Sequence, residues 1–276
     1  MGSESMPAVA AADLTIRELA TPAEFEAGDR LQRRVWGIGK GSTPVPAEVL
    51  NAISHSGGYV AGALEDGRLV GIAAALIGFQ SDARHVFLWA HILAAENRDT
   101  GIGHALMVDQ RSWCRARGID SARWTFDPLV SRNAYFYLTK LGVDVLTYVP
   151  DFYGPLDDGV NLGDESDRLL VAWPLTPCHD QERIGCAKDP EHGPREWRPL
   201  LSIDARGRPQ VHPRGNDVQV TCAVPADIEA LRRQDPALAR SWRHALRECL
   251  SGVLDGGGRI IGFTRLGQYL LTTGDA

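Results

Sequence analysis

The chain has 276 residues, 44% of them hydrophobic and 23% charged, a composition typical of a globular protein with room for one large domain and a smaller second unit. Its formal net charge of −6 argues against a nucleic-acid partner, because binding phosphates needs clustered Lys and Arg. No apolar run reaches membrane-spanning length and the first residues lack the features of a secretory signal, so we expect a cytoplasmic protein with no membrane partner.

Local signals define the elements of the first part of the chain. Thr21, Pro22 and Glu24 form a capping box with Pro at the first helical position. Asp66-Gly67 is a hairpin signal, and Gly118 is a helix C-cap. The predicted elements are a strand at 13–20, helices at 22–36 and 47–56, strands at 58–64, 69–79 and 85–95, and a helix at 101–117.

The composition changes at 176–197, a stretch that is rich in Pro, Gly and charged residues, and we predict a linker or a long loop there. We therefore predict a first domain at 13–175 and a small C-terminal α+β domain at 198–274. The predicted elements are a strand at 121–127, a helix at 131–141, strands at 143–148 and 168–175, a hairpin around 205–207, a strand at 218–224, a helix opening at Pro225, a helix at 236–254, and strands at 259–264 and 268–272.

The stretch that directs the functional interpretation is 97–118, directly after the apolar strand at 85–95. Arg98, Gly101 and Gly103 form an R-x-x-G-x-G loop that leads into a helix. The first amides of a helix lack internal partners and carry partial positive charge, and glycine lets the backbone approach an anion closely. Residues 98–104 are therefore predicted to hold the pyrophosphate of a cofactor.

Other glycine loops fit this stretch less well. A dinucleotide-binding loop would need G-x-G-x-x-G, but its third glycine position is Leu106, and no G-K-[ST] of a nucleotide-triphosphate loop is present. Two alternatives stay open: a nicotinamide-dependent enzyme, and an ordinary strand-to-helix turn with fortuitous glycines.

The loop resembles motif A of the GNAT acyltransferase superfamily, R/Q-x-x-G-x-G/A. Further stretches resemble one family of predicted GNAT acyltransferases of about this length, some of which accompany N-succinylamino-acid racemases. These stretches are Q-R at 110–111, W-T-F-D-P-L at 124–129, N-A-x-F with K-L-G at 133–142, Y-x-P-D-F-Y-G at 148–154, D-R-L at 167–169 and D-P-A-L-A-x-x-W-R at 235–243. The resemblance implies an α/β fold: a GNAT-like core with a mixed, twisted sheet, followed by the smaller C-terminal α+β unit.

The resemblance also implies a function. It points to an N-acyltransferase that moves an acetyl or succinyl group from acetyl-CoA or succinyl-CoA to the amine of a small molecule such as an amino acid. Many GNAT enzymes have a Tyr that protonates the leaving thiol, four residues before the glycine that ends this helix. In this sequence the glycine is Gly142 and the position of the Tyr is Leu138. A non-catalytic acyl-CoA-binding module is therefore the alternative. The acyl group, the acceptor and a homodimeric state are left open.

Candidate site residues follow from this resemblance. His91 is the candidate base, since its ordinary pKa suits proton abstraction near neutrality, and Tyr148 or Tyr153 is the candidate acid. Trp36 and Asp127 are candidate substrate contacts. Each has a structural alternative: a core or packing role for His91, Trp36 and the tyrosines, and a helix cap for Asp127. The candidate cofactor-binding residues are Ile92, Leu93, Ala94, Arg98, Asp99, Thr100, Gly101, Ile102, Gly103, His104 and Asn133, the last of which could also be a helix cap.

The cysteines do not indicate disulfides or metal. Their number, five, is odd and no C-x-x-C spacing occurs, which favours reduced thiols in the cytosol. The only cluster with both Cys and His, at 178–192, matches no compact zinc spacing, so no metal site is predicted.

Overall fold

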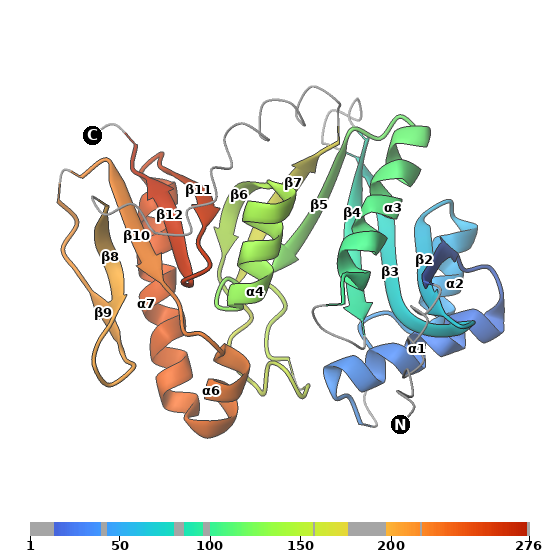
Figure 1. Ribbon diagram of the computed structural model, residues 1–276, viewed down its shortest axis with the longest axis horizontal. Coiled ribbons are helices and arrows are strands. Elements are labelled where there is room, and N and C mark those ends of the chain that lie inside the picture. The colour runs from blue at the N-terminus through green and yellow to red at the C-terminus, as the bar shows by residue number, and fades with distance from the viewer. Residues whose placement is uncertain are drawn as a thin grey trace, which may run out of the picture. The chain divides into compact units, whose positions relative to one another are not determined.

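The computed structural model describes residues 14–39, 43–79, 86–95, 100–156, 158–175, 197–215 and 217–274; within 86–95 it describes the backbone and the Phe87 side chain. The chain forms two compact units (Figure 1). The first contains Met1–Ile77 and Ala90–Trp113, and the second contains Gly78–Trp89 and Cys114–Ala276. Strand β4 passes from the second unit to the first at Ala90.

The first unit contains strands in the order β1-β2-β3-β4, namely β1 (Leu14–Glu18), β2 (Tyr59–Glu65), β3 (Arg68–Phe79) as far as Ile77, and the second half of β4 (Val86–Ala95). β2 pairs antiparallel with both β1 and β3. Asp66 and Gly67 join β2 to β3 with φ of 50° and 78°. Positive φ at both turn positions is the type I′ geometry of tight hairpins, so the hairpin prediction is confirmed.

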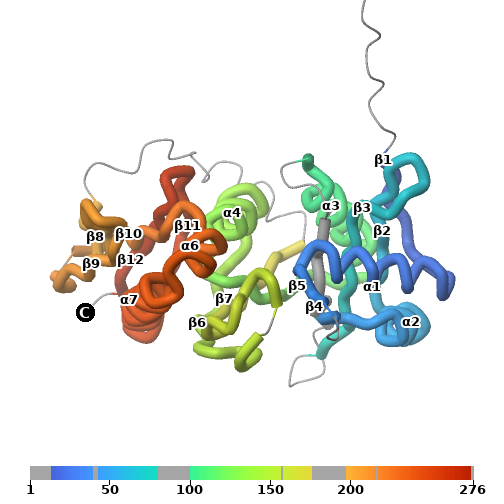
Figure 2. The backbone as a smooth tube through the Cα atoms, turned by 90° about the horizontal axis from the view of Figure 1, so that it is seen from below, coloured from blue at the N-terminus to red at the C-terminus, as the bar shows by residue number. Residues whose placement is uncertain are grey.

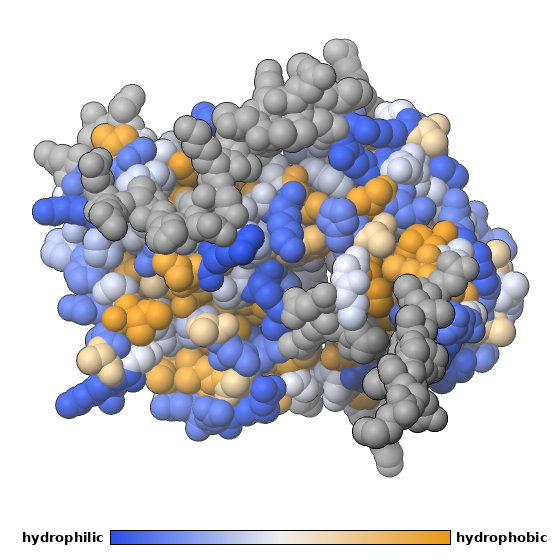
Figure 3. Space-filling view, in the orientation of Figure 1, coloured by the Kyte–Doolittle hydropathy of each residue, from blue (hydrophilic) through white to orange (hydrophobic). Residues whose placement is uncertain are grey.

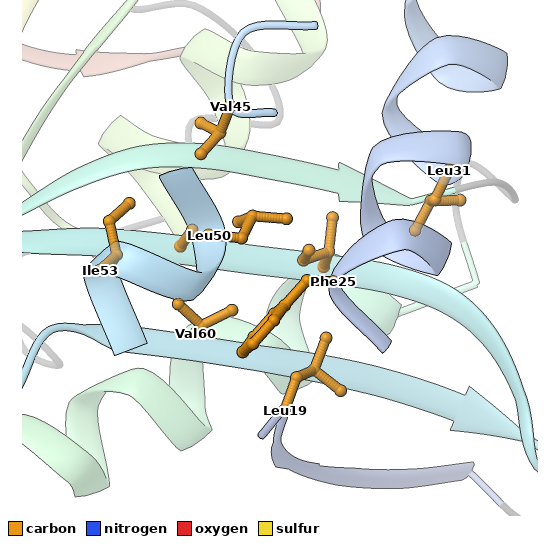
Figure 4. Close-up of a cluster of buried hydrophobic side chains, with 9 residues drawn as sticks. Leu19, Phe25, Leu31, Val45, Leu50, Ile53 and Val60 are labelled. Atoms are coloured by element: carbon orange, nitrogen blue, oxygen red, sulfur yellow. The ribbon is translucent and has the colours of Figure 1, made fainter. Parts of the chain in front are cut away.

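Helices cover both faces of this part of the sheet (Figure 2). The helices α1 (Pro22–Trp36) and α2 (Ala47–His55) pack on one face. Figure 4 shows their apolar side chains meeting those of the strands in a cluster formed by Leu19, Phe25, Leu31, Val45, Leu50, Ile53, Val60, Ile72 and Ala74. The predicted capping box of α1 is confirmed: the Glu24 amide bonds Thr21 Oγ1, and Glu24 Oε2 accepts from the Thr21 amide at 3.0 Å.

Helix α3 (Ile102–Ala116) packs on the opposite face of β2 and β3. A Cβ placed on Gly71 would lie 2.6 Å from Ile102, so the absence of a side chain lets the first turn of α3 approach the strand. At the other end of the helix, Tyr59 makes an edge contact with Trp113 and donates to Asp109 at 2.6 Å. These contacts fix the position of the α3 N-terminus on the strands that precede it.

The second unit contains the strand order β4-β5-β7-β6, with β5 (Ser121–Phe126), β7 (Arg168–Pro174) and β6 (Asp144–Val149). β4 pairs parallel with β5 at Leu88 and Trp89, whereas β7 pairs antiparallel with β5 and β6. The sequence predicts one helix at 131–141. The structure instead has α4 (Ser131–Ala134) followed by the π-helix η1 (Tyr135–Leu141).

A second sheet in this unit has the order β11-β12-β10-β8-β9. Its strands are β8 (Arg198–Ile203), β9 (Pro209–Val211), β10 (Gln219–Ala223), β11 (Arg259–Phe263) and β12 (Gln268–Thr272). Helix α7 (Pro236–Asp255) packs on it through a buried stripe that includes Trp242, Leu246 and Leu250. Helix α6 (Ile228–Gln234) does not open at Pro225 as predicted, because Asp227 caps it by accepting from the Ala230 amide.

The predicted linker at 176–197 lies outside the described residues except for Trp197, so the domain boundary stays a prediction. Hydrophilic and hydrophobic residues alternate over the face drawn in Figure 3. Within the described ranges, no helix is both long and apolar enough to cross a membrane.

Candidate functional site

The turn before α3 has the geometry expected of an anion-binding helix N-terminus. Gly101 has φ of +83°, and the space around a Cβ at this position is open. The helical hydrogen bonds begin where the Ala105 amide donates to the Gly101 carbonyl at 2.9 Å. The amides of Ile102 and Gly103 therefore precede the first bond and point along the helix axis, at the positive end of its dipole.

The side chains of this turn divide into buried and exposed ones. Ile102 is buried against Gly71, so only its backbone can face a ligand. Thr100, Gly101 and His104 are exposed, and Gly103 is half-buried. Arg98 and Asp99 lie outside the described residues.

Strand β4 supplies backbone groups ahead of this turn. The predicted residues Ile92, Leu93 and Ala94 all lie in β4, as does His91. Their side chains lie outside the description, so the structure does not test the role of the His91 imidazole.

The two predicted tyrosines have different surroundings in the second unit. Tyr148 is buried and donates to Asp167 at 2.5 Å. Burial and the Asp167 carboxylate raise the pKa of Tyr148 well above its usual value. Tyr153 is 43% exposed, and its hydroxyl lies 3.1 Å from that of Thr125 on β5. The Tyr148 hydroxyl proton is thus engaged in the hydrogen bond to Asp167, and Tyr153 is the solvent-accessible one of the two candidate acids.

Asp127 does not have the open carboxylate that the substrate prediction requires. It is buried, and its oxygens accept from Arg243 at 2.8 and 3.0 Å and from Arg232 at 2.5 Å. Burial alone would raise the pKa of Asp127, but these two arginines hold it well below its usual range. Nor does its side chain cap α4, whose N-cap is Val130. The structure gives Asp127 a different role, as part of a buried ion-pair network.

We call this the buried network. It joins α6 and α7 to the residues that precede β7 and to the end of β5, and its members are Asp127, Asp164, Arg232 and Arg243. A second, partly exposed group of ion pairs lies on α7 and beside β7 and consists of Glu165, Asp167, His244 and Arg247. Arg243 is fully buried and contacts both Asp127 and Asp164. The sequence analysis missed both groups. The one signal was Arg243 and Arg247 at i, i+4, a spacing that places both on one face of a helix.

Two other predicted contacts have ordinary structural surroundings. Trp36 is half-buried and packs against the apolar cluster between α1, α2 and the sheet, as the core alternative expects. Asn133 is half-buried in α4, and its amide donates to the Val130 carbonyl at 3.0 Å.

The position that the sequence analysis compares with the GNAT tyrosine lies in the π-helix. Leu138 is buried within η1, where i→i+5 bonding changes which side chains share a face. Tyr137, one residue earlier, packs against Trp124 and Phe126 of β5, and burial raises its pKa to about 12. Tyr135 accepts from Arg265 at 2.9 Å. Both tyrosine hydroxyl environments are thus set by packing within the second unit.

Metal ligands do not gather in the part of the chain that the structure describes: no group of three or more His, Cys, Asp or Glu there is placed to hold an ion. The cysteines and histidines at 178–192 lie outside that part. Cys114, Cys222 and Cys249 are buried free thiols.

Comparisons with known proteins place these features in a family context. Residues 25–143 match the family model described as Acetyltransferase (GNAT) family. That segment includes the β4–α3 turn and ends just after η1. No curated protein matches the chain.

Solved structures with similar folds include three bacterial proteins. The ribosomal-protein-S18-alanine N-acetyltransferase of Escherichia coli is 16% identical, with 59% of this chain and 95% of that chain covered and a TM-score of 0.47. A proposed acetyltransferase of Salmonella typhimurium, solved with its cofactor acetyl-CoA, is 18% identical, with 59% and 95% covered and a TM-score of 0.46. An N-acetyltransferase of Staphylococcus aureus Mu50 is 18% identical, with 59% and 99% covered and a TM-score of 0.45. The family match covers residues 25–143 only, and the elements of that segment form a mixed α/β fold.

Proposed function

We propose that this protein is an acyl-CoA-dependent N-acyltransferase that moves an acetyl or succinyl group to the amine of a small molecule such as an amino acid. The observation that carries the proposal is the turn at Gly101, whose positive φ and open surroundings present the first amides of α3. Backbone amides at a helix N-terminus suit a pyrophosphate, the group that distinguishes coenzyme A from most acyl carriers.

In this proposal the cofactor is held mainly by backbone. The amides of residues 101–104 bind the pyrophosphate, with Arg98, Asp99 and Thr100 completing the loop. The backbone of Ile92, Leu93 and Ala94 pairs with the pantetheine amides, as one strand pairs with another. Asn133 contacts the same cofactor. Bound acyl-CoA supplies the activated thioester carbonyl.

The remaining tasks are to position the amine, remove its proton and protonate the departing thiol. His91 on β4 is the proposed base, because its ordinary pKa lies close to neutrality. Tyr153 is the proposed acid, since its hydroxyl is exposed and contacts only a neutral hydroxyl, that of Thr125, among the described residues. Tyr148 is excluded from this role in the proposal because its proton is donated to Asp167.

One observation favours a second candidate, a non-catalytic acyl-CoA-binding module. The position where many GNAT enzymes have an acidic tyrosine is the buried Leu138. Such a module would bind acyl-CoA and release no thiol.

Thiol release measured with DTNB separates the two. Purified protein is mixed with acetyl-CoA or succinyl-CoA and a panel of amines that includes amino acids, and the rate is compared with that of each acyl-CoA alone. Amine-dependent release supports the transferase. Calorimetric binding of acyl-CoA with no release from any amine supports the module, and no binding of either acyl-CoA contradicts both.

A further inference from the structure

One face of the β5–β7 strand pair is only partly buried and carries polar side chains. The register pairs Thr125 with Leu170 and Arg123 with Ala172. Because side chains alternate along a strand, these four residues and Arg168 share one face. Thr125, Leu170 and Ala172 are half-buried. The opposite face is buried and consists of Ala122, Trp124, Phe126, Leu169, Val171 and Trp173.

Arg168 is the unusual residue on the partly buried face. It is 7% exposed, yet it makes no ion pair with any carboxylate in the described ranges. Its Nη1 donates to the main-chain oxygen of Asp167 at 2.8 Å, while the Asp167 carboxylate faces Arg247. Arg232 and Arg243, by contrast, each contact two carboxylates. Burial lowers the pKa of Arg168, and the nearby Asp127 carboxylate opposes this only in part. Holding the cation there therefore costs free energy that an incoming anion would offset.

The surroundings of Arg168 provide more donors and an apolar wall. Its guanidinium centre lies 5.3 Å from the centroid of the Tyr153 ring. The Tyr153 hydroxyl lies 3.1 Å from that of Thr125, so two hydroxyls lie on the same side as the guanidinium. The ring of Phe152 makes an edge contact with the ring of Tyr153, with 4.6 Å between the ring centroids, and Phe152 is 37% exposed. A planar guanidinium beside hydroxyls recognises a carboxylate, and the aromatic pair suits an apolar group next to it.

We propose that Arg168, together with the Thr125 hydroxyl, binds the carboxylate of the substrate and makes the enzyme selective for a carboxylate-bearing partner, while Tyr153 keeps its proposed role as the acid. This rests on the proposed function and narrows it. The same chemistry could reach the site in two ways, as the carboxylate of an amino-acid acceptor or as the distal carboxylate of a succinyl group. Arg168 is a specificity residue here, and no bond is made or broken on it.

Two arms of one kinetic experiment distinguish the sources. In the first arm, acetyl-CoA is assayed with L-phenylalanine and with L-phenylalaninamide, in which a neutral carboxamide replaces the carboxylate. In the second, L-phenylalaninamide is assayed with succinyl-CoA and with acetyl-CoA. We expect the wild type to prefer the carboxylate-bearing partner in one arm by about tenfold or more in kcat/KM, the range of a hydrogen bond to a charged group.

Arg168 variants assign that preference to the residue. In Arg168→Gln the preference should fall about tenfold or more, chiefly through KM, and Arg168→Lys should retain part of it because it retains the charge. Since Arg168 is buried, thermal unfolding and acetyl-CoA calorimetry check that each variant is folded. If Arg168→Gln does not fold, Thr125→Val, at a less buried position, should reduce the preference about two- to tenfold. An unchanged preference in every folded variant, or no preference in the wild type in either arm, would overturn the proposal.

A binding measurement keeps this inference separate from the proposed function. Calorimetry compares N-acetyl-L-phenylalanine, its amide and succinate on the wild type and on Arg168→Gln. Tighter binding of a carboxylate probe that is lost in Arg168→Gln supports the site even if no amine releases thiol, in which case only the acyl-transfer proposal fails. Equal binding of the acid and the amide with no binding of succinate, or no binding of any probe, overturns the site.

Discussion

Asp127→Asn is expected to destabilise the second unit strongly, because it removes a charge from the centre of the buried network. Asp127 Oδ1 accepts from Arg243 Nη1 at 2.8 Å and from the Leu129 amide at 2.9 Å. Oδ2 accepts from Arg232 at 2.5 Å and from Arg243 Nη2 at 3.0 Å. Asparagine has one acceptor oxygen, so its NH2 group would face two guanidinium donors.

The size of the effect follows from burial. Both arginines and Asp127 are buried, and breaking a buried ion pair costs about 3–5 kcal/mol because it leaves a charge uncompensated. We therefore expect the free energy of unfolding to fall by about 3–5 kcal/mol. Urea unfolding followed by circular dichroism measures this change in the free energy of unfolding. The variant and the wild type can be compared if their m-values are the same.

The control is Glu26→Gln on α1, whose ion pair with Arg30 is exposed, with side chains 65% and 61% accessible. Its loss should stay within about 0.5 kcal/mol. The wild type should also lose stability below about pH 4, because the native pKa of Asp127 lies below its ordinary value of 3.8. The contribution of the Asp127 carboxylate to the free energy of unfolding is complete above 3.8 and is lost as pH falls through the native pKa. Asp127→Asn should flatten this dependence. A loss below about 1 kcal/mol would refute the structural role and favour the predicted role as a substrate contact.

Three further predictions concern other residues. His91→Ala should lower the rate of thiol release much more than the affinity for acetyl-CoA, and an unchanged rate would return His91 to a structural role. Tyr148→Phe should lower unfolding stability by about 1 kcal/mol or more through the lost bond to Asp167 while thiol release continues, whereas loss of release in a stable variant would restore Tyr148 as the acid. Glu24→Gln should cost about 0.3–1 kcal/mol at neutral pH, because glutamine can still accept from the Thr21 amide but loses the negative charge at the helix N-terminus. The amide of Ala20 and, less strongly, Arg17 and Thr21 lower the pKa of Glu24 to about 2. The contribution of Glu24 to the free energy of unfolding is therefore complete above pH 4.5 and is lost as pH falls through about 2. An equal difference between the urea midpoints of variant and wild type at about pH 7 and at about pH 2 would contradict this.

The parts of the fold that the sequence predicted correctly are those set by neighbouring residues. The capping box at Thr21 and the hairpin at Asp66-Gly67 each depend on a few adjacent positions. The positive φ of Gly101 and Gly118 likewise follows from what a helix start and a helix end require. Local chemistry therefore predicted most element boundaries in the described ranges.

The parts that it did not predict depend on distant contacts. Asp127 and Arg243 are 116 residues apart, so strand-end position alone could not show that the carboxylate was already paired. The π-helix is tied to β11 by Thr139, which donates to the Phe263 carbonyl at 2.6 Å across 124 residues. Helix α6 shows a local miss: Asp227 provides a side-chain acceptor that Pro225 lacks. The pairing of a charge, unlike a turn, is a property of the tertiary structure.

Calorimetric binding of acetyl-CoA to Gly101→Val and Gly118→Val tests the central claim most directly. Both glycines have positive φ, +83° and +70°, and open space for a side chain, so Val should strain each by about 1–2 kcal/mol. They lie just before α3 and just after it. We predict that Gly101→Val loses acetyl-CoA binding while folded and that Gly118→Val, equally strained, keeps wild-type affinity. Wild-type affinity in Gly101→Val would contradict the assignment of this turn to the cofactor.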